Sequence, residues 1–336
     1  MKSKAIALVS ASTLALALGA AGAAGQAPAD EVEKHVAAAK AAAGQYHSNL
    51  FNTLCSASSI RPAPPAQPGQ TAAAPAQRAA PPERSQWYAE PVKVFDNLYF
   101  VGQTEWSAWA VTTSAGIIII DTIFEYAVEE EVAGGLKKLG LDPAQVKYVI
   151  VSHGHRDHSG GAKLLQDRFG PRVLMSAADW DLLDRNSTDP AKPKRDMVVT
   201  DGQKLTLGDT TLTMYITPGH TQGTISTLIP VKDNGRPHVV AEWGGTLFSS
   251  PIQHTPENLR TYVASAERFR EIAAKAGADA IISNHTNYDG SKAKLPAMAL
   301  RKPGDRHPYV IGKDGVEGYL TVADECARAA LAAMSR

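Results

Sequence analysis

The stretch SHGHRDHSGG at residues 152–161 follows directly on the apolar run VKYVIV, and it constrains this chain more than any other segment. It holds three of the ten histidines and one aspartate: His153, His155, Asp157 and His158. An isolated histidine is usually a surface or core residue, but a cluster with this spacing is typical of metal ligands. In an extended backbone His153 and His155 point to one side, and the next two residues follow where the chain turns. One loop can therefore serve two metal half-sites.

Two further histidines follow other predicted strands. His220 stands in TPGHT and His285 in SNHT, each after an apolar, β-branched run. A catalytic zinc takes three protein ligands and leaves a position for water. Two such sites need two ligands beyond the cluster, and His220 and His285 supply them if the strand ends converge.

Strands and helices alternate over about 250 residues from Trp87 onward, which suits one large domain. Gly208-Asp209 and Asn234-Gly235 predict two hairpins. Thr255 is a predicted helix cap, and the helix that it begins is expected to end before Gly277. Strands are predicted within 98–122, 146–153, 204–221, 224–240 and 278–285, and helices at 160–169 and 255–277.

The chain begins with two lysines, an apolar stretch and small residues that offer Ala-x-Ala at 21–23. Residues 1–24 are therefore predicted to be a secretory signal peptide that is cleaved near Ala23 or Ala24. The mature protein is expected to be secreted or periplasmic.

Three segments follow the signal. Residues 25–57 are alanine-rich and predict a helical N-terminal segment with Asp30 as its cap. Residues 58–86 are rich in proline and alanine and predict a disordered linker, because they have too few large apolar side chains to bury. Residues 87–336 form the predicted main domain.

The 34 basic residues balance the 34 acidic ones. This neutral charge gives no field that attracts nucleic acid or an anionic membrane. No run after the signal approaches the roughly 20 apolar residues of a membrane helix. We therefore expect a small-molecule substrate, no nucleic-acid partner and no stable membrane insertion, whereas the oligomeric state stays open.

Cys55 and Cys326 are the only cysteines. In an oxidising compartment they can form only one intramolecular disulfide, and the amphipathic stretch GYLTVADECARAAL around Cys326 is suited to dock the N-terminal helix. We predict that bond. The alternative is two inert, buried thiols.

The His-x-His-x-Asp-His motif resembles the signature of the metallo-β-lactamase superfamily, and the resemblance extends over residues 87–336. It implies an αββα sandwich with two zinc ions at one edge. Carried over position by position, it assigns the first zinc to His153, His155 and His220. It assigns the second zinc to Asp157, His158 and His285.

Departures from the family pattern narrow the resemblance. Glyoxalase-type hydrolases and lactonases of this superfamily have a bridging aspartate where WGGTLF has Gly245. Neither cysteine is placed as in the cysteine-using lactamases. What remains resembles the subclass that binds its second zinc through aspartate and two histidines, which implies hydrolysis of a β-lactam or a related cyclic amide or ester. The alternatives are an exported hydrolase of lactones, thioesters or sulfate esters, and a zinc-binding protein without turnover.

The resemblance also implies a mechanism. A zinc-bound water has a pKa of about 7 and supplies hydroxide at neutral pH. Asp157, as a ligand of the second zinc, is expected to orient that hydroxide and is the predicted catalytic residue. Asp121 resembles the carboxylate that hydrogen-bonds the metal loop, or it is a turn residue at a strand end. Arg156 either attracts a substrate carboxylate or faces solvent. Five further loop residues either face substrate or are ordinary: Thr246, Ser249, Ser250, Asn284 and Tyr288.

Overall fold

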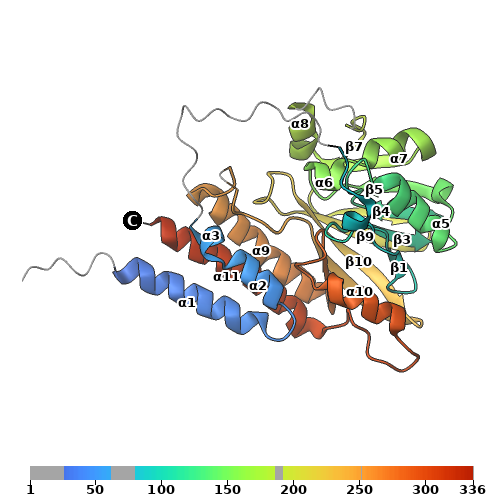
Figure 1. Ribbon diagram of the computed structural model, residues 1–336. Helices are drawn as coiled ribbons and strands as arrows, with labels where there is room; N and C mark the ends of the chain where they lie inside the picture. The colour runs from blue at the N-terminus through green and yellow to red at the C-terminus, as the bar shows by residue number, and fades with distance from the viewer. Residues whose placement is uncertain (1–25, 62–79, 186–191, 251, 336) are drawn as a thin grey trace, which may run out of the picture.

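The computed structural model describes residues 26–61, 80–185, 192–250 and 252–335. Two β-sheets pack face to face, and helices cover the outer face of each (Figure 1). This is the predicted αββα sandwich. Apolar side chains of both sheets fill the space between them, among them Ile120, Ile150, Met214, Ile229 and Ile282.

The first sheet carries the cluster loop. Its seven strands are hydrogen-bonded in sequence order, antiparallel from β1 to β4 and parallel from β4 to β7. Because β4 and β5 are parallel neighbours, the residues that follow them, Asp121 and the 152–161 loop, lie at the same edge. The strands are β1 Val92–Lys93, β2 Leu98–Phe100, β3 Trp109–Thr113, β4 Gly116–Ile120, β5 Val146–Ile150, β6 Arg172–Ser176 and β7 Met197–Val199.

The second sheet has the order β12-β11-β10-β9-β8. Both predicted hairpins are confirmed. Asn234 and Gly235 have φ of 50° and 79°, the left-handed conformation that a two-residue hairpin turn requires. β12 is parallel to β11, so their carboxyl ends are adjacent. The strands are β8 Gln203–Leu207, β9 Thr210–Ile216, β10 Ile225–Asp233, β11 Arg236–Trp243 and β12 Ala280–Ser283.

The helices seal the outer faces. α9 begins as predicted, with the Thr255 hydroxyl accepting a hydrogen bond from the Asn258 N–H, and it ends at left-handed Gly277. The first sheet is covered by η1 Glu129–Gly134, α5 Gly135–Lys138, α7 Ala162–Phe169 and α8 Ala177–Arg185, and the second by α9 Pro256–Ala276 and α11 Gly312–Met334. Short elements connect them: η2 Pro143–Gln145, α6 Arg156–Ser159 and α10 Ser291–Leu300. Across the described residues, no helix is both long enough and apolar enough to span a membrane.

The N-terminal segment forms α1 Gln26–Ala43, α2 Ser48–Leu54 and α3 Ala57–Ile60. Asp30 is not the cap that we predicted: it lies inside α1, because Pro28 falls in the first turn, where a proline costs the helix no hydrogen bond.

The predicted linker was too wide at both ends. α3 and α4 Arg84–Trp87 each bury a large apolar side chain, Ile60 and Trp87 respectively. Residues 62–79 of the predicted linker and the predicted signal peptide, residues 1–24, lie outside the described residues.

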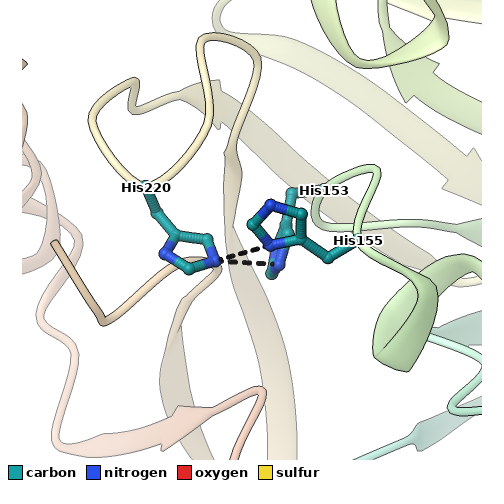
Figure 2. A group of neighbouring side chains, drawn as sticks. All are labelled: His153, His155 and His220. Atoms are coloured by element: carbon teal, nitrogen blue, oxygen red, sulfur yellow. Dashed lines mark hydrogen bonds between the residues drawn. The ribbon is translucent and has the colours of Figure 1, made fainter. Parts of the chain in front are cut away.

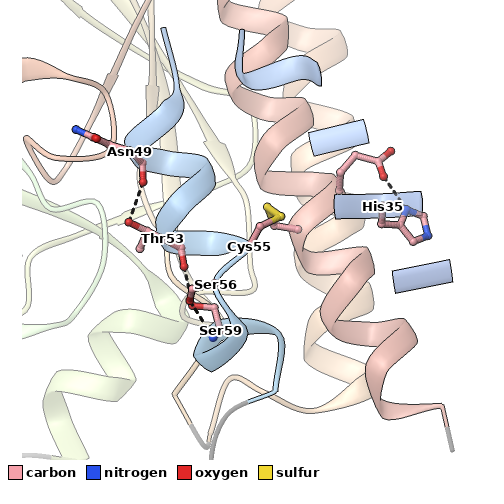
Figure 3. The surroundings of a disulfide bond; sticks show 8 residues. His35, Asn49, Thr53, Cys55, Ser56 and Ser59 are labelled. Carbon is pink, nitrogen blue, oxygen red and sulfur yellow. Dashed lines mark hydrogen bonds and ion pairs between the residues drawn. A yellow bond between two sulfur atoms is a disulfide. The ribbon is translucent and has the colours of Figure 1, made fainter. Parts of the chain in front are cut away.

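The N-terminal helices belong to the main core. α1 and α11 lie side by side (Figure 1) and pack so closely that a Cβ on Gly318 would stand 2.6 Å from the Ala42 carbonyl oxygen. His47 is buried and donates its Nε2–H to the Gly315 carbonyl at 2.7 Å. The predicted Cys55–Cys326 disulfide is present and joins the residue after α2 to α11 (Figure 3).

This disulfide should contribute strongly to stability. It joins residues 271 positions apart, and closing so long a loop is worth about 5 kcal/mol in the chain-entropy model. Reductant should therefore lower the denaturant midpoint of the native protein and leave that of the Cys55→Ser/Cys326→Ser double variant unchanged. Mass spectrometry under non-reducing conditions checks the bond, and two free thiols in protein prepared under oxidising conditions would contradict it.

Candidate metal centre

The predicted ligand side chains converge at one edge of the sandwich. The cluster loop follows β5, His220 lies between β9 and β10, and His285 follows β12. Backbone hydrogen bonds fix these loops to one another, since Ser152 accepts from the Ile225 N–H at 2.8 Å across the two sheets. The six side chains form two groups of three, each with ligand atoms within 4.8 Å of one another.

The first group is His153, His155 and His220 (Figure 2). Its ring nitrogens meet at one point: His220 Nε2 lies 3.0 Å from His155 Nδ1 and 3.1 Å from His153 Nε2. His153 donates its Nδ1–H to the Gly244 carbonyl at 2.8 Å, and His220 donates its Nδ1–H to the Leu247 carbonyl at 2.6 Å. Both Nε2 atoms therefore present a lone pair to the centre of the group.

These imidazoles are suited to hold a metal ion. Burial lowers the pKa of His153 well below 6.5 and that of His220 to about 3, so both rings are neutral at physiological pH. Two lone pairs facing each other at 3.1 Å repel unless a cation lies between them. Nitrogens on a tetrahedral zinc are separated by about 3.3 Å. The observed separations are close to that value.

The second group is Asp157, His158 and His285. Asp157 Oδ2 lies 3.1 Å from His158 Nε2 and 3.6 Å from His285 Nε2. His158 is fully buried, and its Nε2 lacks a hydrogen-bond partner with acceptable geometry. The ring centroids of His153 and His158 are 4.2 Å apart, so the two groups are adjacent.

The charges of the second group favour a cation. Burial would lower the pKa of His158, but the carboxylates of Asp157 and Asp121 outweigh it and raise the pKa to about 10. Burial would raise the pKa of Asp157, but the neighbouring histidines, His158 foremost, hold it well below its usual range. Asp157 is therefore ionised, and a carboxylate with two imidazoles is a donor set that zinc accepts.

Asp121 supports both the ligands and their loop. Its Oδ2 accepts hydrogen bonds from His158 Nδ1 at 2.9 Å and from the Ser152 hydroxyl at 2.8 Å. Its Oδ1 accepts from the Ser152 backbone N–H at 2.7 Å. Asp121 also adopts a left-handed φ of 59°, a costly backbone conformation that persists where the surrounding contacts impose it. Of its two readings, the geometry matches the carboxylate that orients the metal loop.

Of the five loop residues that were expected either to face substrate or to be ordinary, two are buried and do not face substrate. Asn284 is 2% exposed and donates to the Gly244 carbonyl at 2.6 Å. Thr246 is 1% exposed, with its hydroxyl 3.2 Å from that of Ser283 and 3.4 Å from that of Tyr319. They are buried because α11 covers the ends of β11 and β12.

The other named residues are nearer the surface. The Tyr288 ring centroid lies 5.1 Å from that of His285. Ser249 is half-buried and Ser250 is exposed. The Arg156 guanidinium forms an ion pair with Glu125, so its charge is already matched.

The loop of His220 has supports that the sequence did not reveal. Gln253 Nε2 donates to the His220 carbonyl at 2.7 Å. Asn258 Nδ2 donates to the Gly219 carbonyl at 2.6 Å and to the Gln253 carbonyl at 2.9 Å. These amides join the His220 loop to the start of α9. No motif marks them, because their partners are backbone carbonyls of a loop far away in the sequence.

Gly245 packs directly against a predicted ligand. A Cβ at this position would stand 2.5 Å from His220 Cβ and 2.9 Å from Thr224 Cγ2. A bridging aspartate therefore does not fit here unless His220 moves.

Replacing Gly245 with alanine should displace His220. We expect the zinc affinity of the first group, which contains His220, to fall about 10- to 100-fold, which chelator competition measures. Gly134→Ala is the control, because the nearest atom to its added Cβ is 3.4 Å away. Unchanged zinc affinity in Gly245→Ala would show that His220 is not a ligand or that its loop yields freely.

Comparison with known sequences gives the following relationships. A sequence model described as the metallo-beta-lactamase superfamily matches residues 105–233, which include every predicted ligand except His285. The chain is 32% identical over 144 residues to a hydroxyacylglutathione hydrolase of Acidiphilium cryptum, covering 42% of this chain and 49% of that protein. It is 25% identical over 183 residues to an acyl-coenzyme A thioesterase of Gallus gallus, covering 47% and 64% respectively. The chain thus spans only about half to two thirds of these relatives.

Similarity to solved structures extends further along the chain. A subclass B3 metallo-β-lactamase of Bradyrhizobium japonicum superposes with a TM-score of 0.62 at 25% identity, over 72% of this chain and 94% of that one. A variant metallo-β-lactamase from Legionella gormanii gives a TM-score of 0.62 at 23% identity, over 70% and 92%, and shows the shared fold. The uncovered part of this chain includes more than a quarter of its residues in each case.

Proposed function

We propose that this chain, which belongs to the metallo-β-lactamase superfamily, is a two-zinc hydrolase that opens β-lactams or related cyclic amides and esters. The observation that carries the proposal is the convergence of six side chains into two adjacent groups of three, on loops from both sheets. The similarity to a subclass B3 enzyme over 94% of its length supports β-lactams as the first substrate class.

The residues divide the work as follows. Zinc, when bound, acts as a Lewis acid on the carbonyl and brings the pKa of a coordinated water to about 7. His153, His155 and His220 would hold the first ion, and Asp157, His158 and His285 would hold the second. The ionised Asp157 lies beside His158 and His285, where its carboxylate would accept a hydrogen bond from the attacking water and orient it. Asp121 keeps the His158 proton on Nδ1, so Nε2 faces the metal.

The chain's own nucleophiles support this division. Both cysteines are in the disulfide. Ser152 is buried and donates its hydroxyl to Asp121. The cysteines are therefore excluded as nucleophiles. Ser250 is exposed and lines the pocket beside His155 and His220, but its hydroxyl lies 3.4 Å from the Gln253 N–H and, within the described residues, forms no hydrogen bond with a histidine that could take its proton, so water is the nucleophile of this mechanism.

The second candidate function is thioester hydrolysis. It is favoured by the sequence relatives, which are named as a hydroxyacylglutathione hydrolase and an acyl-coenzyme A thioesterase. Against it stands Gly245, because the glyoxalase-type pattern places an aspartate there and the structure leaves no room for one.

Export is part of the proposal. Residues 1–24 have the order of charge, apolar stretch and small residues that a signal peptide needs. The Cys55–Cys326 disulfide supports it, since such bonds persist in oxidising compartments. The mass of the protein from the periplasm should correspond to cleavage near Ala23 or Ala24.

One substrate panel tests the function. Purified mature protein with added zinc is assayed on a carbapenem, a cephalosporin, a lactone, a thioester and a sulfate ester. Highest kcat/KM on a β-lactam supports the first candidate, and highest kcat/KM on the thioester supports the second. No turnover of any of the five would contradict both.

A further inference from the structure

A pocket opens beside the first group of histidines. It has a volume of about 190 Å³, and His155 and His220 form one wall. α8 contributes the second wall. The third wall consists of Gln253 from the loop before α9 and Asn258 from the first turn of α9. A substrate whose carbonyl lies at the metal groups therefore extends one of its substituents into this space.

The described lining of the pocket has one exposed positive charge. Arg185, at the end of α8, is the only lysine or arginine among the lining residues that the structure describes. Its neighbours on the same helix are already neutralised: Asp184 pairs with Lys192 at 2.9 Å, and Asp181 pairs with Arg195 at 2.6 Å. Within the described ranges, no carboxylate lies within ion-pair distance of Arg185. Its guanidinium is therefore available to a ligand.

The one carboxylate in the described lining, that of Asp179, already accepts hydrogen bonds from neighbouring groups. Asp179 is 1% exposed, and it accepts hydrogen bonds from the Thr221 hydroxyl at 2.7 Å and the Gly154 N–H at 3.0 Å. It holds the cluster loop to the His220 loop and does not reach Arg185 with a hydrogen bond. The other polar lining residues are uncharged, so Arg185 is the one charged side chain of the described lining that is exposed, whereas the Asp179 carboxylate is buried.

The rim combines this charge with apolar surface. Ile252 is 90% exposed, which is unusual for a large aliphatic side chain, and half-buried Leu182 also lines the pocket. An exposed isoleucine beside an unpaired arginine is complementary to a substituent with an apolar body and an anionic end.

From this arrangement we infer that Arg185 selects substrates that carry a carboxylate on the substituent bound beside His155 and His220. The inference rests on the proposed function for the bond that is cleaved, and it adds the charge of the substrate. Arg156 does not take this role, because Glu125 already pairs with it. Arg185 is a specificity residue, so it acts on binding and leaves the cleavage step unchanged.

The test compares each free acid with its methyl ester. One pair is a cephalosporin and its carboxyl methyl ester, and the other is a succinyl thioester and its methyl ester. Arg185→Gln should raise KM for the free acids about five- to tenfold, with kcat and the KM of the esters unchanged. Arg195→Gln is the matched control: it removes the same charge from the same surface, but its guanidinium is engaged by Asp181 and Asp184. It should change neither KM.

The outcomes separate this inference from the proposed function. If wild-type protein cleaves the substrates but Arg185→Gln affects acid and ester equally, or neither, the specificity role is wrong and the hydrolase stands. If wild-type protein cleaves none of these substrates, calorimetric titration with each free acid and its methyl ester still tests whether Arg185 selects the carboxylate. Tighter binding of the acid that Arg185→Gln abolishes supports the inference, and equal binding overturns it. A preference for the acid that weakens as salt rises adds support, because an exposed charge pair is screened.

Discussion

Removing zinc should abolish hydrolysis, and adding zinc back should restore it. The expected loss is about a thousandfold or more, because the proposed nucleophile is a water that only a bound metal ion activates. The experiment treats the mature protein with a chelator, removes the chelator by dialysis, verifies metal content by elemental analysis and then titrates zinc back.

Two controls make this result specific. A serine-directed inhibitor should have no effect on the zinc-loaded protein. Circular dichroism of the metal-free protein should show the native signal. One apolar cluster lies between the two sheets and the other two lie between the sheets and their covering helices, so none of them depends on the metal edge. Full activity of protein shown to be free of metal would rule out the mechanism as a whole.

Replacing His285 with alanine should halve the bound metal. The second group would keep only Asp157 and His158, whereas the first group would keep all three histidines. Since a catalytic zinc needs three protein ligands, the content should fall from about two zinc ions per chain to about one. Turnover should fall about a hundredfold, because the stabilisation of the leaving group is lost.

The matched control is His238→Ala. His238 lies on β11 and pairs with Asp279 at 2.6 Å, so its loss removes an imidazole and a charged contact but no predicted ligand. It should retain two zinc ions and normal turnover. Two tightly bound zinc ions and normal turnover in His285→Ala would show that His285 is not a ligand. The resemblance to the subclass that binds its second zinc through aspartate and two histidines would then be wrong.

The fold class and the grouping of candidate ligands were predicted from the family resemblance that the His-x-His-x-Asp-His motif carries, whereas the hairpins and the long helix were predictable from local pattern. The hairpin at Asn234-Gly235 needs left-handed residues, and the sequence places an asparagine and a glycine there. The helix after Thr255 shows its buried face by periodicity, because apolar residues recur at helical spacing in the sequence and all of them are buried: Leu259, Tyr262, Ala266, Phe269 and Ala273.

Features that depend on distant contacts were not predictable. Arg185 stands out only because Asp181 and Asp184 find other partners, and those pairings are a property of the folded chain. Asn258 has no unusual sequence context, yet its side-chain amide donates a hydrogen bond to the carbonyl of Gly219, which lies 39 positions away in the sequence. Thr246 and Asn284 looked like exposed loop residues, because nothing local reveals that α11 covers them.

The packing of α1 and α2 on α11 also sets the order in which the protein can mature. The chain is made from its amino end, so Cys55 is available long before Cys326, which lies 271 residues later and within the last helix. Ala39, Leu50 and Leu54 stay without their apolar partners on α11 until that helix has been synthesised. These helices are thus among the first to be made and the last to be packed, and Cys55 has no partner cysteine in its own chain until α11 has been made.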